Sequence, residues 1–169
     1  MIIGIGGVSN SGKSRLARRL AARFGDRSVR IFHQDQYVFP VDQIPVIDGH
    51  PDWEIPESID FQRLRKEVGE AARAFDIIIV EGLMAFYDQG LREYYDRMIQ
   101  IVIPKERFMS RKAKDKRWGT EPGWYMEHIW NSHLRFGQLP ENTGNLLTLD
   151  GTAGIDIDKV FRYVCQSEV

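Results

Sequence analysis

The sequence Gly7-Val8-Ser9-Asn10-Ser11-Gly12-Lys13-Ser14 matches the phosphate-binding pattern G-x-x-x-x-G-K-[ST] at every fixed position. In such a loop the glycines permit a tight turn, so that successive backbone N–H groups can point at phosphate oxygens. The lysine supplies an ammonium group for the β- and γ-phosphates, and the serine supplies a hydroxyl group for Mg²⁺. We therefore predict a P-loop that contacts a nucleoside triphosphate through Gly7, Ser9, Asn10, Ser11, Gly12, Lys13 and Ser14.

The residues on both sides of this stretch support the prediction. The apolar run from Met1 to Ile5 predicts a buried strand before the loop. After the loop, Leu16, Leu20 and Phe24 are spaced by four, which predicts a helix whose positive end faces the bound anion. The alternative is a glycine-rich turn with an incidental Lys-Ser, and it would require this order of strand, loop and helix to be a coincidence.

Length and composition indicate a single domain, 1–169. The chain has 169 residues and 43% hydrophobic residues, enough for one core and too few for two ordinary domains. The formal net charge of −1 does not point to nucleic acid or to an anionic membrane as a partner. One cysteine excludes an internal disulfide, and no leader or run of ~20 apolar residues is found. We expect a cytoplasmic protein, a monomer or homodimer, that is not bound to membranes.

Further strands and helices alternate along the chain. Apolar runs predict strands at 29–32, 77–80, 98–103 and 145–149, and periodic patterns predict helices at 58–75, 106–116, 124–139 and 157–164. In the helix at 124–139 we expect Trp124, His128 or Ile129 and Leu134 or Phe136 to form the apolar side. The stretch 38–56 carries four prolines and is predicted to be a long ordered loop.

This order predicts the α/β class, a parallel sheet covered by helices on both faces, as in nucleotide kinases. A GTPase is less consistent with the chain, because it would more often need an Asn-Lys-x-Asp guanine signature, which is absent here.

Two carboxylates follow predicted strands. Asp35 comes after the second strand and Glu81 ends the strand at 77–80. Ligands of parallel sheets gather at the carboxyl ends of the strands, so both acids are expected at the P-loop edge. We predict that Ser14 and Glu81 surround Mg²⁺ and that Asp35 is the catalytic base for an acceptor hydroxyl. Alternatively, Asp35 caps a helix and Glu81 pairs with a lysine.

The helix at 106–116 is strongly basic and runs into the turn-rich stretch 118–123. A basic helix followed by a flexible connection suits a lid that closes over phosphates, so we predict a lid at about 107–123. Arg111 and Lys114 would be its cations. The alternative is a solvated helix face. With the P-loop and Asp35, this set provides what a phosphoryl transferase needs, and Lys13, Arg111 and Asp35 are the predicted catalytic residues.

Linked motifs also resemble the uridine kinase and nicotinamide riboside kinase group. They are the P-loop, Gln34-Asp35, Trp53-Glu54-x-Pro56-Glu57-Ser58-Ile59-Asp60, Val80-Glu81-Gly82, Pro122-Gly123 and Leu149-Asp150-Gly151-Thr152. The resemblance spans nearly the whole chain. It implies transfer of the γ-phosphate of ATP, with Mg²⁺, to the 5′-hydroxyl of a ribonucleoside. It also implies that Arg111-x-x-Lys114-Asp115 is the lid motif and that Gly151 and Thr152 contact the nucleotide.

The short stretch 34–54 is closer to the nicotinamide riboside kinases, which makes nicotinamide riboside the expected acceptor. At the family's ribose-binding aspartate this chain has Glu54, and at a lid tyrosine it has Lys116. The residues expected at the acceptor are Asp35, Tyr37, Trp53, Glu54, Asp115 and Trp118. Trp53 is either a stacking partner for the base or a loop anchor in the core.

Other readings remain open at this point. The chain could be a uridine or cytidine kinase, a kinase of a non-nucleoside alcohol such as pantothenate, or a non-catalytic ATP-binding protein. The four histidines show no spacing that indicates a metal site, so no chemistry is assigned to them.

Overall fold

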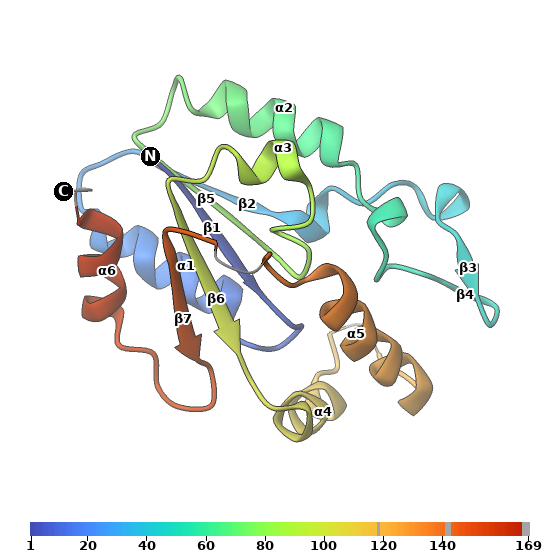
Figure 1. The fold of residues 1–169 in the computed structure, drawn as a ribbon. Coiled ribbons are helices and arrows are strands. Elements are labelled where there is room, and N and C mark those ends of the chain that lie inside the picture. The colour runs from blue at the N-terminus through green and yellow to red at the C-terminus, as the bar shows by residue number, and fades with distance from the viewer. Residues whose placement is uncertain (118, 141–142, 167–169) are drawn as a thin grey trace.

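A parallel sheet of five strands forms the centre of the computed structural model, which describes residues 1–117, 119–140 and 143–166 (Figure 1). The strand order is β2-β5-β1-β6-β7. All four pairings between these strands are parallel. The strands are β1 (Ile2–Gly7), β2 (Val29–His33), β5 (Ile77–Gly82), β6 (Arg97–Val102) and β7 (Leu146–Asp150). The predicted fold class is confirmed.

Helices cover both faces of the sheet because the inner strands are apolar on both sides, as in β5, where every residue is buried. One core cluster joins the sheet to α1 (Lys13–Arg23) and α6 (Ile157–Cys165). The other cluster contains residues of α2 (Phe61–Ala71), α3 (Gln89–Arg92), α4 (Lys105–Lys114) and α5 (Gly123–Phe136). Among the described residues, no helix is both long and apolar enough to span a bilayer.

Two details differ from the sequence prediction. The helix expected from residue 58 begins at Phe61, because Asp60 caps it by accepting a hydrogen bond from Arg63 N (2.9 Å), and Pro56–Ser58 forms a separate 3-10 turn, η3. The four-residue helix α3 was not predicted, since so short a segment shows no periodicity.

The buried face of α5 also differs. Its buried residues include Tyr125, Ile129 and His133, whereas Trp124 and Leu134 are exposed. The prediction was therefore wrong for Trp124, while of the alternatives that it left open Ile129 is buried and Phe136 packs against the core. Aromatic and apolar residues occur all round this helix, so periodicity alone could not identify the buried side.

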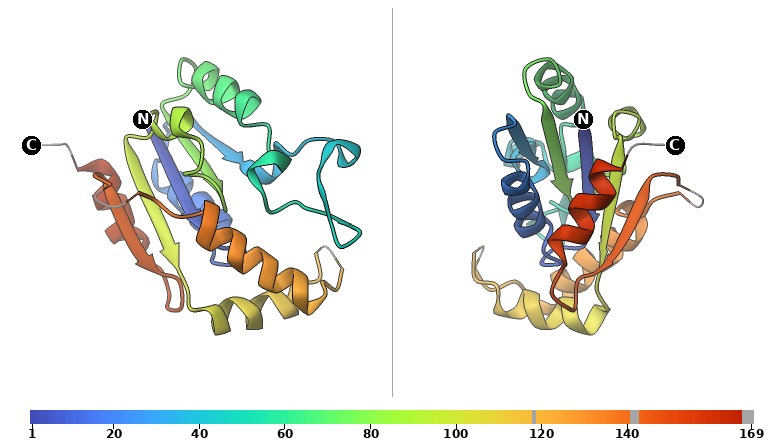
Figure 2. Two further views of the ribbon diagram at one scale, coloured as in Figure 1. Left: turned by 45° about the vertical axis from the view of Figure 1, so that its right-hand side comes forward. Right: turned by 90° about the vertical axis from the view of Figure 1, so that its left-hand side faces the viewer.

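The long loop between β2 and α2 is ordered, as predicted. It contains the 3-10 turns η1 (Gln34–Gln36) and η2 (Val41–Gln43) and a small hairpin of β3 (Val46–Ile47) and β4 (His50–Pro51). This loop, α4 and α5 all lie beyond the carboxyl ends of the strands (Figures 1 and 2). The sheet edge that carries the P-loop is therefore flanked by two long insertions.

Glycines in the central strand let aromatic rings pack directly on its backbone. A Cβ atom at Gly6 would lie 2.3 Å from Cε2 of Phe86, and one at Gly4 would lie 2.7 Å from the ring of Tyr95. Phe86 and Tyr95 are themselves buried. The strand before the P-loop therefore has no room for side chains on this face.

We predict that Gly6→Ala lowers the free energy of unfolding by about 1–3 kcal/mol, because overpacking forces the Phe86 ring to move. Urea unfolding measures the loss. Gly123→Ala is the matched control, since a Cβ there meets no atom within 4 Å. Equal stability of the two variants would contradict the packing argument.

Candidate active site

The P-loop lies between β1 and α1 and has the backbone conformation that its glycines permit. Gly7 has φ 147° and Gly12 has φ 108°. A Cβ at Gly7 would lie 2.6 Å from the carbonyl oxygen of Ile101, whereas one at Gly12 would face open space. Lys13 is buried and donates a hydrogen bond from Nζ to Val8 O (3.1 Å), so its ammonium group folds back over the loop.

Glu81 connects the P-loop helix to the neighbouring strands. Its Oε1 accepts hydrogen bonds from Ser14 Oγ (2.8 Å) and from Nδ1 of His33 (2.6 Å). Glu81 ends β5 and is buried, and His33 ends β2. The predicted pair Ser14 and Glu81 is thus in direct contact, with His33 as a third member that the sequence did not indicate.

A buried histidine lies beside the P-loop lysine. His133 of α5 is buried, and both this burial and the charge of Lys13 lower its pKa to about 4. Its Nδ1 has no hydrogen-bond partner among the described residues, while Gln138 Nε2 lies 3.2 Å from its Nε2. The imidazole is therefore neutral at pH 7 and adds no positive charge beside Lys13.

Asp35 lies in η1 directly after β2, and its side chain is exposed. It is close enough to Glu54 for its charge to raise the pKa of that carboxyl group. The predicted base and the predicted ribose ligand therefore lie near each other.

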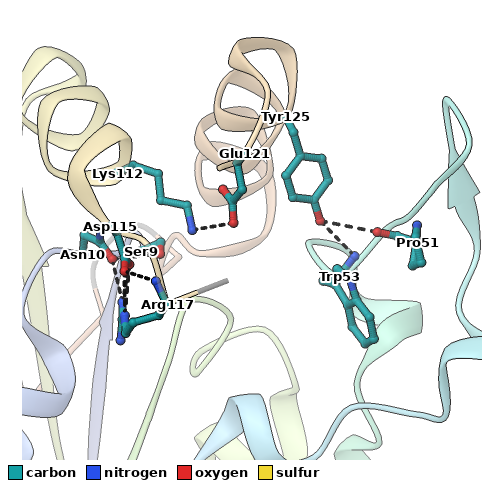
Figure 3. A network of polar contacts seen from close by, with 9 residues as sticks. All are labelled: Ser9, Asn10, Pro51, Trp53, Lys112, Asp115, Arg117, Glu121 and Tyr125. Carbon is teal, nitrogen blue, oxygen red and sulfur yellow. Dashed lines mark hydrogen bonds and ion pairs between the residues drawn. The ribbon is translucent and has the colours of Figure 1, made fainter. Parts of the chain in front are cut away.

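The acceptor loop, 50–56, is held by α5. Asp52 is buried and its Oδ1 accepts hydrogen bonds from His128 Nε2 (2.7 Å) and from Glu54 N (3.1 Å). Trp53 N donates to the hydroxyl group of Tyr125 (3.3 Å), as Figure 3 shows. These bonds set the position of Trp53 and Glu54. The indole of Trp53 is partly buried and packs against the core, and its stacking on a base stays a prediction.

Glu54 lies in a cluster of carboxylates. Burial, together with the smaller effects of the charges of Asp35, Glu121 and Asp52 and against the charge of Lys112, raises its pKa to about 7. Lys112 of α4 is buried and pairs with Glu121 (2.9 Å), as Figure 3 shows. Oε2 of Glu121 is buried without a hydrogen-bond partner among the described residues. The cluster therefore carries more negative than positive charge.

Residues 107–123 are named the lid segment here. Arg111 donates from Nη1 to Asn10 O (3.2 Å) and from Nη2 to Gly151 O (2.8 Å), so it joins the lid segment to the P-loop and to the loop after β7. The neighbouring Thr152 donates to Asp150 through its backbone N–H (2.7 Å) and its hydroxyl group (2.6 Å). A pocket of about 370 Å³ lies here, lined by Asn10, Gly12, Arg15, Arg111, Gly151 and Ile155 among others.

Some predicted site residues do not join this group. Tyr37 is buried, and its hydroxyl group donates a hydrogen bond to Glu67 of α2 (2.5 Å). Burial and this hydrogen bond raise the pKa of Tyr37 to about 12. Lys114 is exposed, and no described residue forms a hydrogen bond or ion pair with it. Trp118 lies outside the described residues.

Sequence reasoning also missed residues at the site. Lys112, Glu121, Arg117, His33 and His128 carry no motif and were not assigned. Only their place in segments already predicted to be functional could have drawn attention to them.

Comparison with known proteins adds to this geometry. No protein-family model matches the chain. It is 27% identical to nicotinamide riboside kinase 1 of Rattus norvegicus, with 89% of this chain and 86% of the relative covered. It is 28% identical to nicotinamide riboside kinase 2 of Homo sapiens (98% and 80% covered) and 26% identical to a uridine kinase of Deinococcus deserti (80% and 80%).

Solved structures share the fold. A deoxyadenosine kinase from M. mycoides with bound dATP matches with a TM-score of 0.62 at 16% identity, covering 98% of this chain and 100% of the other. A gluconokinase from Sinorhizobium meliloti 1021 matches with a TM-score of 0.60 at 15% identity, covering 95% and 87%.

The chain has the P-loop kinase fold, as its sheet order, its P-loop and these similar structures show. The curated relatives confirm the resemblance to the uridine kinase and nicotinamide riboside kinase group. The chain is therefore a phosphotransferase that acts on a hydroxyl group, and its relatives indicate a nucleoside kinase.

We predict that His133 makes the fold sensitive to acid. A histidine with a folded pKa of about 4 and an ordinary value of 6.5 contributes its full stability above pH 6.5 and loses it as the pH falls toward 4. The free energy of unfolding should fall by about 2 kcal/mol between pH 7 and 5 because of this group. Urea unfolding of the wild type and His133→Gln measures it; parallel pH profiles would contradict a neutral buried imidazole.

Proposed function

We propose that the protein transfers the γ-phosphate of ATP to the 5′-hydroxyl of a ribonucleoside, and that nicotinamide riboside is its acceptor. The observation that carries the choice of acceptor is the carboxylate cluster around Glu54, because this acceptor bears a permanent positive charge on its pyridinium ring. The relatives with 27–28% identity that are named nicotinamide riboside kinases support the proposal.

The donor side fits a magnesium–nucleotide. Gly12 has a left-handed backbone conformation and faces open space. The Ser14 hydroxyl group is hydrogen-bonded to the Glu81 carboxylate, and this pair of oxygen ligands suits a hard cation. When bound, Mg²⁺ neutralises charge on the β- and γ-phosphate oxygens. The P-loop amides and Lys13 hold these phosphates, and the pocket beside Arg111 and Gly151 accepts the nucleoside part of the donor.

On the acceptor side, Asp35 takes the proton of the 5′-hydroxyl as that oxygen attacks the γ-phosphorus. Its exposure keeps the carboxylate free to approach a substrate. Base catalysis of this kind contributes roughly 10²–10⁴-fold, so most of the acceleration comes from positioning and electrostatics. Glu54 binds the ribose hydroxyls, held in place by the Asp52–His128 pair.

The carboxylate cluster favours a cationic acceptor over a neutral one. Two unit charges about 5 Å apart interact by roughly 3 kcal/mol at an effective dielectric constant of 20. In the free protein the pKa of Glu54 is raised, so its ionised form is disfavoured. A cation bound beside Glu54 lowers this pKa and favours the ionised form. Uridine and cytidine carry no charge, so they would not neutralise the negative charge of the cluster.

Asp35→Asn tests the base. We predict that kcat falls by roughly 10²–10⁴-fold while the Kd for ATP changes little, because Asp35 faces the acceptor. Stopped assays of phosphorylated product and calorimetric titration with ATP measure the two quantities. Normal turnover by this variant would assign Asp35 a structural role.

Glu54 provides the test of the acceptor. With a pKa of about 7, Glu54 is mostly ionised at pH 8 and mostly protonated at pH 6. We predict that the KM for nicotinamide riboside rises by up to about tenfold from pH 8 to pH 6, because the protonated acid no longer attracts the cation. ADP release at three pH values measures KM.

Two controls make this test specific. The reduced dihydropyridine form of the riboside has a similar shape without the charge, and its KM should change by less than about twofold. Glu54→Gln should flatten the pH profile of the cationic acceptor. Better use of uridine or pantothenate than of nicotinamide riboside would refute the proposed acceptor.

A further inference from the structure

Among the described residues, neither cation of the lid motif forms a hydrogen bond or ion pair with Asp35 or with a side chain of the P-loop. Arg111 uses both terminal nitrogens on the carbonyl oxygens of Asn10 and Gly151, next to the nucleoside pocket. Lys114 is exposed and has no polar contact with the described part of the chain. A transferring phosphoryl group carries negative charge on three oxygens. Of the predicted cationic side chains, Lys13 would then be the one placed to neutralise this charge.

A different residue of the lid segment fills this position. Arg117 donates from Nη2 to the side-chain oxygen of Asn10 in the P-loop (3.0 Å). Figure 3 shows Arg117 with Asp115, Asn10 and Ser9 in one group, apart from the group formed by Tyr125, Trp53 and Pro51. The guanidinium group of Arg117 is thus anchored directly over the phosphate-binding loop.

Arg117 also faces the two acids of the reaction centre. Hydrogen bonding to Asp115 raises its pKa most, and the charges of Asp35 and Glu81 raise it further. Asp35 is the proposed base, and Glu81 holds the Ser14 hydroxyl group (2.8 Å). A cation that senses both carboxylates and contacts the P-loop lies close to the path between donor and acceptor.

Asp115 fixes the orientation of this guanidinium group. Its carboxylate accepts from Arg117 Nε (2.9 and 3.1 Å), from Nη2 (2.6 Å) and from the backbone N–H (3.1 Å). These bonds lower the pKa of Asp115 well below its usual range, so it stays ionised. The Arg117 side chain is 68% exposed, which leaves its remaining nitrogen Nη1 free to turn toward a ligand.

We propose that Arg117, outside the lid motif, is the catalytic lid cation that contacts the γ-phosphoryl group during transfer, and that Asp115 positions it. This inference rests on the proposed kinase function. In the step, the bond from the γ-phosphorus to the β,γ-bridging oxygen breaks and the bond to the acceptor 5′-oxygen forms. The hydroxyl proton goes to Asp35, the leaving oxygen stays on ADP, and the guanidinium donates to the equatorial oxygens. Arg117 can present Nη1 to these oxygens while Nε and Nη2 stay on Asp115, an arrangement that an ammonium group cannot reproduce.

Kinetics of variants in the lid segment test the assignment. Arg117→Ala should lower kcat by about 10²-fold or more, the range of a lost charge donor to a transition state, and Arg117→Lys should recover less than about a tenth of it. Added guanidinium ion should partly rescue Arg117→Ala. Arg107→Ala is the matched control, since it removes an exposed cation of the lid segment, and it should stay near wild type.

A second readout does not depend on the acceptor. ADP with aluminium fluoride imitates the transferring phosphoryl group, and calorimetry gives its affinity beside that of ADP alone. We expect Arg117→Ala to weaken ADP–aluminium fluoride binding by at least about tenfold while the ADP Kd stays within about twofold. A residue that only clamps the lid segment onto the P-loop would change both affinities equally.

The outcomes separate the two proposals. If Arg117→Ala keeps more than a third of wild-type kcat, or if Lys114→Ala loses activity while Arg117→Ala does not, the assignment of Arg117 is overturned. If the wild type phosphorylates no acceptor, the proposed function fails, and the aluminium fluoride titration still decides whether Arg117 contacts the phosphoryl position.

Discussion

The parallel register of three strands is the constraint on which the site depends. Ile5 of β1 pairs with Glu81 of β5, and Glu81 pairs with His33 of β2. Because parallel strands end at the same edge, this register brings the P-loop, the acid and the histidine together without help from any loop. The Ser14–Glu81 hydrogen bond (2.8 Å) then joins α1 to the carboxyl end of β5. A slip of one residue would turn Glu81 to the opposite face.

The same edge concentrates charges that weaken the free protein. Glu54 is held in an environment that disfavours its ionised form, and Glu121 has a buried oxygen without a hydrogen-bond partner among the described residues. Such arrangements cost stability, and they are typical of sites that interact most strongly with a ligand. The core cluster between the sheet and helices α1 and α6 is apolar and stabilises the fold.

Much of the fold could be predicted from local sequence because its signals are local. The P-loop follows from eight adjacent residues, and the strand at β5 from four consecutive β-branched ones. Asp35 and Glu81 were placed by the rule for strand ends, and the structure puts both at that edge. Their catalytic roles stay predictions.

The other contacts of the site join segments that are far apart in the sequence. Asp52 meets His128 across 76 positions, and Arg117 meets Asn10 across 107, which no spacing within the sequence encodes. The lysine that pairs in the lid segment is Lys112, not the motif residue Lys114, because the side of α4 that faces α5 is set by packing of Phe108 in the core. The wrong face of α5 has a similar origin, since aromatic residues on two sides of a helix leave its rotation to tertiary contacts.

The attachment of the acceptor loop to α5 has a consequence for motion. His128 and Tyr125 hold Asp52 and Trp53, and α5 is the element into which the lid segment continues. Any displacement of α5 would therefore carry Trp53 and Glu54 with it, because Tyr125 and His128 bind this loop directly. The same helix continues from the lid segment, so movement of the lid segment and movement of the loop that carries Glu54 are mechanically coupled.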